Sequence, residues 1–503
     1  MKQISEKQLL VITAFCSILL SLWLSASSDI ISRDSTLYLK VAQAFLDAGF
    51  VEAFKTWSWP FYPIFFALIH QLTGLSLEYS AYALNAILNA VVCVAFVKIY
   101  SKIAFNGHRL WVAALFIITF VGFNDYRGDI IRGYGFWAFT LLAVYYYICF
   151  YQTRQKAEAF KWQISIFIAT LFRPEAIVFA FAAPLFFLFI PSVPFKQRLS
   201  SYAWLSSFIL LIVLSISVVF LVSSEFRELI LNHRPVQADY LSPSFLLGSF
   251  NQGVDNFIKY VLVWDFSAKY APLMLASGLL TMLVYKVLLN LGLVYAGIWG
   301  AGIYHKWLHL RKESWIVLYF ALIAFVILMV LNFSRFYVSS RYIVLLVILL
   351  GLIVAQYLDV LLQKLFQNRK KWLLTAVSAY IAVQFLDSII SIGASKAPIK
   401  DIAQWTVQNV DTNEKIACNE SRLGYYSNYH CTDITSISDF YSPEKITQLK
   451  QQGFRYLLLW VKHNNKAMHK ALADKKQFEL LKKFANKKDD LGALYLIKQG
   501  KEK

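Results

Sequence analysis

The sequence predicts a polytopic α-helical membrane protein of about eleven transmembrane helices, followed by a small α/β domain at the C-terminus. Hydrophobic residues make up 58% of the 503 residues and charged residues only 16%, whereas soluble chains usually carry about 25% charged residues. Near-uncharged runs of about 20 residues recur as far as Ile392, and runs of that length are typical of bilayer-spanning helices. After Ile392, Lys and Asp become frequent and apolar runs shorten to strand length. We therefore predict a transmembrane domain over residues 1–393 and a soluble domain over residues 394–503.

Two of the apolar runs, 162–172 and 175–190, are short and meet at Arg173-Pro174-Glu175, which indicates a bent hairpin or a single kinked span. The run 271–304 is long enough for a span plus an interfacial helix. The first run could be a signal peptide, but it lacks a clean cleavage site, so we favour a retained first helix. The predicted spans lie near residues 9–26, 80–97, 110–123, 133–151, 162–172, 175–190, 201–222, 271–304, 315–332, 342–360 and 372–392.

The net charge of +19 would suit a nucleic-acid-binding protein. Much of this charge, however, lies in short loops between apolar runs, where it orients helices across a membrane. With the N-terminus inside the cell, every predicted inner loop is basic, and the C-terminal domain lies outside. The apolar segment Trp59 to Leu77 would reverse this order if it crossed the membrane. Because Pro60 and Pro63 interrupt it, we interpret it as interfacial or re-entrant. The inner loops carry Lys98, Lys102 and Arg109; Arg154, Lys156 and Lys161; Lys196 and Arg198; Lys306, Arg311 and Lys312; and Lys364, Arg369, Lys370 and Lys371.

In the C-terminal domain, three short apolar runs predict buried strands and three amphipathic stretches predict helices. Cys418 and Cys431 fall in this domain, and they could form a disulfide if it lies outside the cytoplasm; the alternative is two unpaired thiols. The sequence has no Cys/His metal pattern, so we assign no metal ligands. The strands are expected at 415–418, 455–461 and 494–497, and the helices at 399–409, 443–452 and 466–484.

The first outer segment opens with Ser32-Arg33-Asp34-Ser35-Thr36-Leu37-Tyr38, directly after the first span. The apolar spacing over Leu37 to Phe54 predicts an amphipathic helix on the bilayer surface. A carboxylate at this boundary can act as a general base, which makes Asp34 a candidate catalytic residue with Arg33 and Tyr38 beside it. The alternative is that Asp34 only caps the following helix.

The second outer loop, Asn124 to Arg132, holds two acids and two arginines. Arg127 and Arg132 are candidates for binding a phosphate, because a guanidinium offers forked donors to phosphate oxygens. Asp125 or Asp129 could hold a sugar hydroxyl, assist a base or bind a divalent cation. The alternative is internal salt bridging without a ligand.

Further charges on the outer side are candidates for the same pocket. Arg173 and Glu175 lie at membrane depth, where charges usually face a partner or a cavity; a plain ion pair at a kink is the alternative. Outer-face arginines go against the orientation rule, and a lipid phosphate would explain them, although headgroup contact is simpler for any single residue. The remaining candidates are His233, Arg234, Arg335 and Arg341.

The order of these features resembles the GT-C glycosyltransferases, in particular the bacterial protein-mannosyltransferase and aminoarabinose-transferase group with the lipopolysaccharide-core transferases. The resemblance covers the whole layout and is sharpest over residues 32–63 and 124–136. It implies an inverting enzyme of the inner membrane that moves a sugar from a polyprenyl-phosphate donor to an envelope lipid, glycan or protein. It also implies Asp34 as the base, Asp125 or Asp129 as the second-loop acid, and Arg127, Arg132 and Arg341 as donor-phosphate ligands. Family members often carry an acidic pair in the first loop, whereas Ser35 follows Asp34 here, so this loop lacks the paired acids of a metal site; a divalent cation stays open as a cofactor.

Two other classes of protein stay open. An O-antigen ligase or polymerase also uses outer-face arginines, but such enzymes usually lack an acid directly after the first helix and a C-terminal α/β domain. A lipid or solute transporter would favour internal repeats and broken helices in both halves of the chain. No repeat is evident, and the unusual charges gather on one face.

Overall fold

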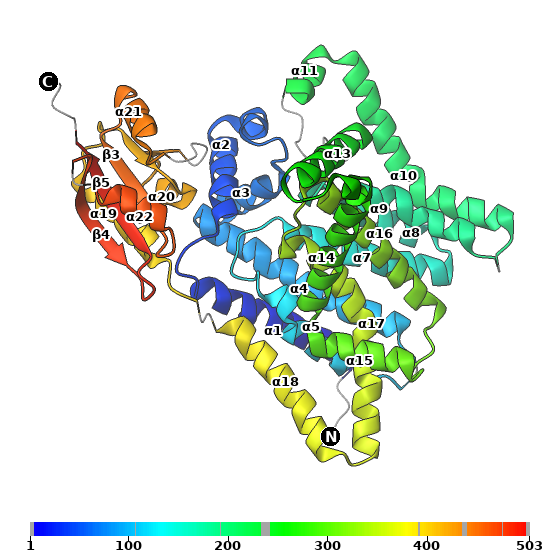
Figure 1. Cartoon of the computed structure of the whole chain (residues 1–503). Helices are drawn as coiled ribbons and strands as arrows, with labels where there is room; N and C mark the ends of the chain where they lie inside the picture. The colour runs from blue at the N-terminus through cyan, green and yellow to red at the C-terminus, as the bar shows by residue number, and fades with distance from the viewer. Residues whose placement is uncertain are drawn as a thin grey trace. The chain divides into compact units, whose positions relative to one another are not determined.

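The computed structural model describes residues 5–105, 107–191, 193–232, 242–390, 393–434, 440–474 and 476–498 (Figure 1). His233 and Arg234 lie outside these ranges. The chain forms two compact units. The first, here called the transmembrane unit, comprises Met1–Ser25 and Val41–Ile390. The second, here called the C-terminal unit, comprises Ser391–Lys503 together with Ala26–Lys40, a segment from near the start of the chain.

In the described residues, eight helical segments are long and apolar enough to cross a bilayer. This confirms the prediction of a polytopic helical membrane protein. Each segment coincides with one of the predicted runs. The segments are α1 (Glu6–Ala26), α4 (Leu77–Ile103), α7 (Gly133–Thr153), α10 (Phe195–Val222), η2 with α14 (Asp265–Tyr270 and Ala271–Leu291), α16 (Lys312–Arg335), α17 (Ser340–Gln367) and α18 (Lys371–Ile389).

The other predicted runs form shorter helices. The run 271–304 divides at Gly292, whose φ of 90° ends α14 and starts α15, because a left-handed backbone favours glycine. The runs on either side of Pro174 are separate helices, so the bent hairpin is correct rather than a single kinked span. These shorter helices are α5 (Leu110–Thr119), α6 (Val121–Asn124), α8 (Lys156–Phe172), α9 (Ala176–Ala182), η1 (Ala183–Phe189) and α15 (Leu293–Tyr304).

The outer segments are helical as well. α2 (Arg33–Thr56) begins four residues before the predicted Leu37, and it contains a break at Gly49. α3 (Phe61–Thr73) lies between Pro60 and Gly74; its 13 residues extend only about 20 Å, too short for a bilayer core of about 30 Å. Between α10 and α14 the described residues form the helices α11 (Ser224–Asn232) and α13 (Pro243–Tyr260).

α17 forms the centre of the transmembrane unit. Its most apolar window is 89% buried, whereas the corresponding windows of α10 and α18 are 17% and 11% buried. α17 packs against α5, α14, α15 and α16. The first turn of α17 is therefore held from several sides, and it carries Ser340, Arg341 and Tyr342.

The C-terminal unit contains a five-stranded sheet in the order β2-β1-β3-β5-β4. β1 pairs in parallel with β2 and β3, whereas β5 pairs antiparallel with β3 and β4. Side chains alternate between two cores: Leu457 and Leu459 face one, Leu458 and Trp460 face the other. The strands are β1 (Ile416–Cys418), β2 (Cys431–Asp433), β3 (Tyr456–Val461), β4 (Phe478–Ala485) and β5 (Leu491–Ile497), and the helices are α19 (Ala397–Asn409), α20 (Ser421–Tyr426), α21 (Pro443–Gln451) and α22 (Lys466–Leu472).

The prediction of one helix over 466–484 is wrong in its second half. α22 ends at Leu472, and Phe478–Ala485 is the edge strand β4. The apolar residues Phe478, Leu480, Leu481 and Phe484 fit a helical period as well as a strand, and the pairing with β5 decides for the strand.

Candidate active site

Arg132 precedes the first residue of α7, where α7 lies against the end of α8. A Cβ atom on Gly135 would overlap the Phe172 ring, so glycine allows the two helices to approach closely. The Arg132 side chain is 8% exposed, and its guanidinium lies 4.9 Å from the centre of the Trp57 ring. Its Nη1 is buried and has no hydrogen-bond partner among the described residues. A buried donor without an acceptor is unfavourable unless a ligand supplies one.

The turn between α8 and α9 carries a buried ion pair. Pro174 disfavours a helical conformation at the preceding residue, and Arg173 is extended, with φ −145° and ψ 122°. Arg173 Nη2 donates to Glu175 Oε1 over 2.9 Å, and the two residues are 6% and 4% exposed. The charges of Arg173 and Arg132 both act on the Glu175 carboxylate.

Tyr342 joins this turn to the start of α17. The Arg173 guanidinium lies 4.2 Å from the centre of the Tyr342 ring and 5.2 Å from that of Phe136, and the Arg341 guanidinium lies 5.7 Å from the centre of the Tyr342 ring. Arg132 and Arg335 are also near enough to act electrostatically on Tyr342. Three arginines thus act on neighbouring groups: Arg132 and Arg173 on the Glu175 carboxylate, and all three, Arg132, Arg173 and Arg335, on Tyr342. We call these three residues with Glu175 the arginine cluster.

A cavity of about 300 Å³, including the open space at its mouth, borders the arginine cluster. Arg173, Glu175 and Tyr342 form its polar end, and aliphatic and phenyl groups form its other walls. The cavity is therefore charged at one end and apolar elsewhere. The apolar lining consists of Phe136, Phe179, Ala324, Ile327, Leu328, Leu331 and Leu345.

A second cavity, of about 540 Å³, is more polar and holds Asp125. A Cβ atom on Gly122 would overlap the carbonyl oxygen of Asn290, so α6 lies directly against the end of α14. The Asp125 carboxyl keeps contact with solvent, but partial burial, with a further contribution from Asp387, raises its pKa to about 6. The first turn of α17 borders both cavities, through Ser340 here and Tyr342 in the first. The lining residues are Phe120, Val121, Gly122, Asp125, Leu289, Asn290, Leu291, Gly292, Ser340 and Gln384.

The other two charged residues of the second outer loop lie differently. Asp129 lines neither cavity, and its carbonyl oxygen accepts a hydrogen bond from Asn85. Arg127 is completely buried, and its guanidinium donates to Asn124 Oδ1, Ser17 Oγ and Ser21 Oγ over 2.7 to 2.9 Å. It therefore ties the loop to α1, and these contacts support a structural role for Arg127.

Arg33, Asp34 and Tyr38 belong to the C-terminal unit. Asp34 lies in the first turn of α2, and Arg33 forms an ion pair with Glu420 at 2.7 Å. A pocket shared by Asp34 with the arginines remains a prediction. In the described part of the chain, no group of three or more His, Cys, Asp or Glu side chains could hold a metal ion.

Sequence reasoning found the charged residues of the arginine cluster but not the rings that cover them. Trp57 and Phe136 contact guanidinium groups, and the sequence analysis predicted neither contact. Nothing in the sequence connected Asn290 or Gln384 with Asp125, because they come from α14 and α18 and reach the cavity only through tertiary packing.

These features define a multi-pass membrane protein with a cavity between its helices that is charged at one end and apolar elsewhere. Neither a protein-family model nor a curated protein sequence matches the chain. Solved structures do: ArnT from Cupriavidus metallidurans bound to undecaprenyl phosphate matches with a TM-score of 0.56 and 12% identity, covering 98% of both chains. ArnT in the apo state matches with a TM-score of 0.53 and 10% identity over 97% of both chains.

Arabinofuranosyltransferase AftD from Mycobacteria matches 99% of this chain and 40% of its own, with 13% identity and a TM-score of 0.49. The near-complete match to ArnT establishes the fold. The chain has the GT-C glycosyltransferase fold, as the sequence resemblance predicted.

Proposed function

We propose that this protein transfers a sugar from a polyprenyl-phosphate-linked donor to an acceptor of the cell envelope, at the outer face of the membrane. The observation that carries the proposal is the arginine cluster. Two guanidinium groups, those of Arg132 and Arg173, act on one carboxylate beside an apolar cavity, and Arg335 acts on the adjoining Tyr342; a lipid phosphate would balance their positive charge. ArnT has the same fold, and one of its crystal structures holds bound undecaprenyl phosphate.

The proposed reaction is a displacement at the anomeric carbon. The acceptor hydroxyl attacks that carbon, the bond from the carbon to the phosphate oxygen breaks, and the lipid phosphate leaves with the bonding electrons. Arg132, Arg173, Arg335 and Arg341 would stabilise the charge that develops on the phosphate. Asp34 would accept the proton of the acceptor hydroxyl. Attack from the face opposite the phosphate inverts the anomeric configuration.

Asp125 is our choice for the second-loop acid. Unlike Asp129, it lines one of the two cavities that the first turn of α17 borders, and its raised pKa suits a group that exchanges protons near neutral pH. We propose that it contacts a hydroxyl of the donor sugar or of the acceptor.

The proposed orientation places the N-terminus in the cytoplasm and the C-terminal unit outside the membrane. Two observations support it. The short loops on the proposed inner side are all basic, and Cys418 and Cys431 form a disulfide, which persists in oxidising compartments.

The test is mass spectrometry of envelope glycans and glycolipids from a deletion strain complemented with variants. We expect wild type and Asp47→Asn to restore the missing sugar, because the exposed Asp47 lies on the same helix as Asp34 and contacts only Gln43 in the described hydrogen bonds. We expect Asp34→Asn to restore none. Full restoration by Asp34→Asn would remove Asp34 from the proposed mechanism. If the glycans of the deletion strain match those of wild type, the transferase function itself is wrong.

A further inference from the structure

The segment 26–40 is fixed to the C-terminal unit by contacts with one short loop. The Ile31 backbone N–H donates to the Tyr426 hydroxyl over 2.9 Å, and Arg33 donates to both carboxylate oxygens of Glu420, over 2.7 and 3.2 Å. Ile30 packs against a core of the unit. Glu420 and Tyr426 both lie between Cys418 and Cys431, so one loop contacts the residues on the N-terminal side of Asp34.

Glu420 is a buried carboxylate held by two arginines. It is 2% exposed, and it accepts hydrogen bonds from Arg422 Nε and Nη2 over 3.0 and 3.2 Å in addition to those from Arg33. Burial raises its pKa, but the hydrogen bonds from Arg33 and Arg422 outweigh burial and hold the pKa at about 2. The carboxylate is therefore ionised and saturated with donors at neutral pH.

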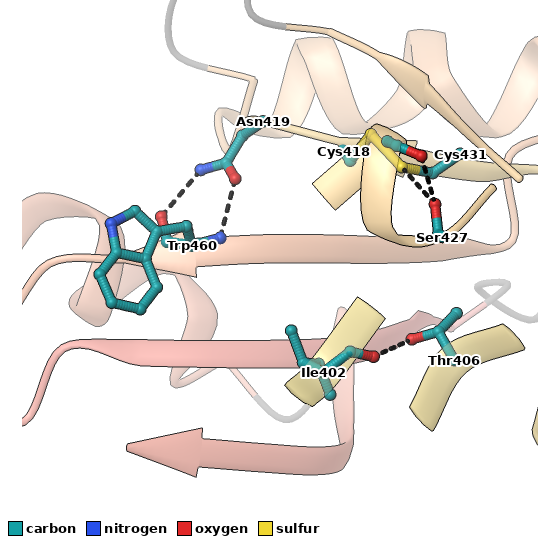
Figure 2. The surroundings of a disulfide bond; sticks show 8 residues. Ile402, Thr406, Cys418, Asn419, Ser427, Cys431 and Trp460 are labelled. Atoms are coloured by element: carbon teal, nitrogen blue, oxygen red, sulfur yellow. Dashed lines mark hydrogen bonds between the residues drawn. A yellow bond between two sulfur atoms is a disulfide. The ribbon is translucent and has the colours of Figure 1, made fainter. Parts of the chain in front are cut away.

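The loop that carries Glu420 is itself anchored at both ends, as Figure 2 shows. The disulfide joins Cys418 at the end of β1 to Cys431 at the start of β2. Next to it, the Asn419 side chain accepts from the Trp460 backbone N–H over 2.8 Å and donates to the Trp460 carbonyl over 3.0 Å. The Ser427 hydroxyl donates to the Gly424 carbonyl. These contacts give the loop a fixed geometry relative to the sheet.

We propose that Glu420 is a positioning residue for Asp34. Through Arg33, the disulfide-closed loop 418–431 fixes the first turn of α2 and with it the orientation of the Asp34 carboxylate. The C-terminal unit would then be part of the catalytic apparatus and not merely an appended domain. This inference rests on the proposed function of Asp34 as the base.

The burial of the Glu420 carboxylate favours a role in positioning segment 26–40 over a purely stabilising role. Burying the Glu420 carboxylate removes it from water, and this cost can cancel its attraction to the arginines. Arg33 is 65% exposed, so solvent screening weakens its pairing further. An apolar contact would hold segment 26–40 at a lower free-energy cost. A carboxylate with fixed hydrogen-bond donors, in contrast, also determines the orientation of the segment. A directional contact next to a catalytic group is what reproducible placement of that group requires.

The test compares Glu420→Gln with Glu414→Gln in the full-length protein. Glu414 lies in the same unit and pairs with Arg455 at 2.6 Å, so its variant removes a more exposed ion pair of that unit without touching segment 26–40. Hydrogen exchange by mass spectrometry reports the order of peptides 28–40. We expect Glu420→Gln to speed their exchange about tenfold, the effect of losing a charged hydrogen bond, and Glu414→Gln to leave it unchanged.

Transfer is then measured by the glycan assay at saturating and limiting acceptor. For Glu420→Gln we expect a lower maximal rate with unchanged binding of undecaprenyl phosphate, and for Glu420→Asp a partial recovery. Tyr426→Phe, which removes a single hydroxyl, should speed exchange of the same peptides to a smaller extent. This milder variant keeps the test valid if Glu420→Gln misfolds. Unchanged exchange in both Glu420→Gln and Tyr426→Phe would overturn the proposal, as would faster exchange with a wild-type rate. Exchange does not depend on transfer, so a protein without transferase activity would refute the proposed function alone.

Discussion

Arg173 Nη2 donates to Glu175 Oε1 over 2.9 Å, and both side chains are almost completely removed from solvent. The pair is not self-contained, because Arg132 also acts on Glu175. A single carboxylate therefore balances more positive charge than it carries. An anion that enters the neighbouring cavity would complete the balance.

We expect Glu175→Gln to destabilise the protein by about 3 kcal/mol, because it leaves Arg173 buried without its carboxylate. Addition of undecaprenyl phosphate should raise the unfolding temperature more in this variant than in wild type, since the phosphate replaces the lost negative charge. Thermal unfolding in detergent with and without the lipid measures both effects. Glu158→Gln is the control: it removes the pair with Lys161, whose side chain is half exposed, and should change stability by less than about 0.5 kcal/mol. Equal stability of the two variants would contradict the structure.

Arg132 and Arg127 provide a matched pair of substitutions. Arg132→Gln should weaken undecaprenyl phosphate binding about tenfold or more, because one charged hydrogen bond to the phosphate is lost, with little effect on folding. Arg127→Gln should instead destabilise the fold and leave lipid binding unchanged. It strips Ser17, Ser21 and Asn124 of their common donor and should cost about 3 kcal/mol of stability, while the folded fraction keeps its affinity for the lipid.

The measurements for this pair are lipid titration by native mass spectrometry and thermal unfolding of the same samples. The structure would be contradicted if Arg127→Gln were as stable as wild type. Normal lipid affinity of Arg132→Gln would remove Arg132 from the proposed phosphate site.

The raised pKa of Asp125 predicts that stability and activity change with pH in opposite directions. Its pKa in the folded protein, about 6, exceeds the value of about 4 for an unfolded chain. Between these pH values the folded state binds more protons, so stability should fall as pH rises from about 4 to about 6 and stay level above. The effect should be modest because the carboxyl keeps contact with solvent. If ionised Asp125 takes part in transfer, activity should instead fall as pH drops below about 6.

Asp125→Asn should remove the pH dependence of stability in this range, and Asp129→Asn should not. Unfolding temperatures between pH 4.5 and 7.5 and transfer rates over the same range, followed by glycan mass spectrometry, test both. A wild-type stability that rises with pH over this window, relative to Asp125→Asn, would refute the raised pKa.

Much of the architecture could be predicted because it follows from local composition. The length of apolar runs identifies helices such as α17, and the turn at Arg173-Pro174-Glu175 follows from Pro174. The charged candidates were visible for the same reason: Arg132, Arg173 and Arg335 stand out against apolar surroundings. These signals require only a few neighbouring residues.

The features that escaped prediction depend on long-range packing. Arg127 and Arg132 have the same chemistry and are five positions apart in one loop, yet only the fold determines that Arg127 contacts Ser17 and Ser21 in α1. Residues Phe478–Ala485 form the strand β4 because they pair with β5. The assignment of residues 26–40 to the C-terminal unit rests on Glu420 and Tyr426, almost 400 positions away.

The cysteines give a test of both the fold of the C-terminal unit and the proposed orientation. Of the five cysteines, Cys418 and Cys431 form a disulfide and the other three are free thiols. After denaturation in SDS, a maleimide-coupled polymer should label three thiols without reductant and five with it. Cys418→Ala should expose one further thiol, that of Cys431, without reductant. Closing a loop of this size contributes about 3 kcal/mol, so reduction should also lower the unfolding temperature. Five labels without reductant, on protein taken from native membranes and alkylated at once, would mean that this unit lies in a reducing compartment, and the outward orientation would have to be reversed.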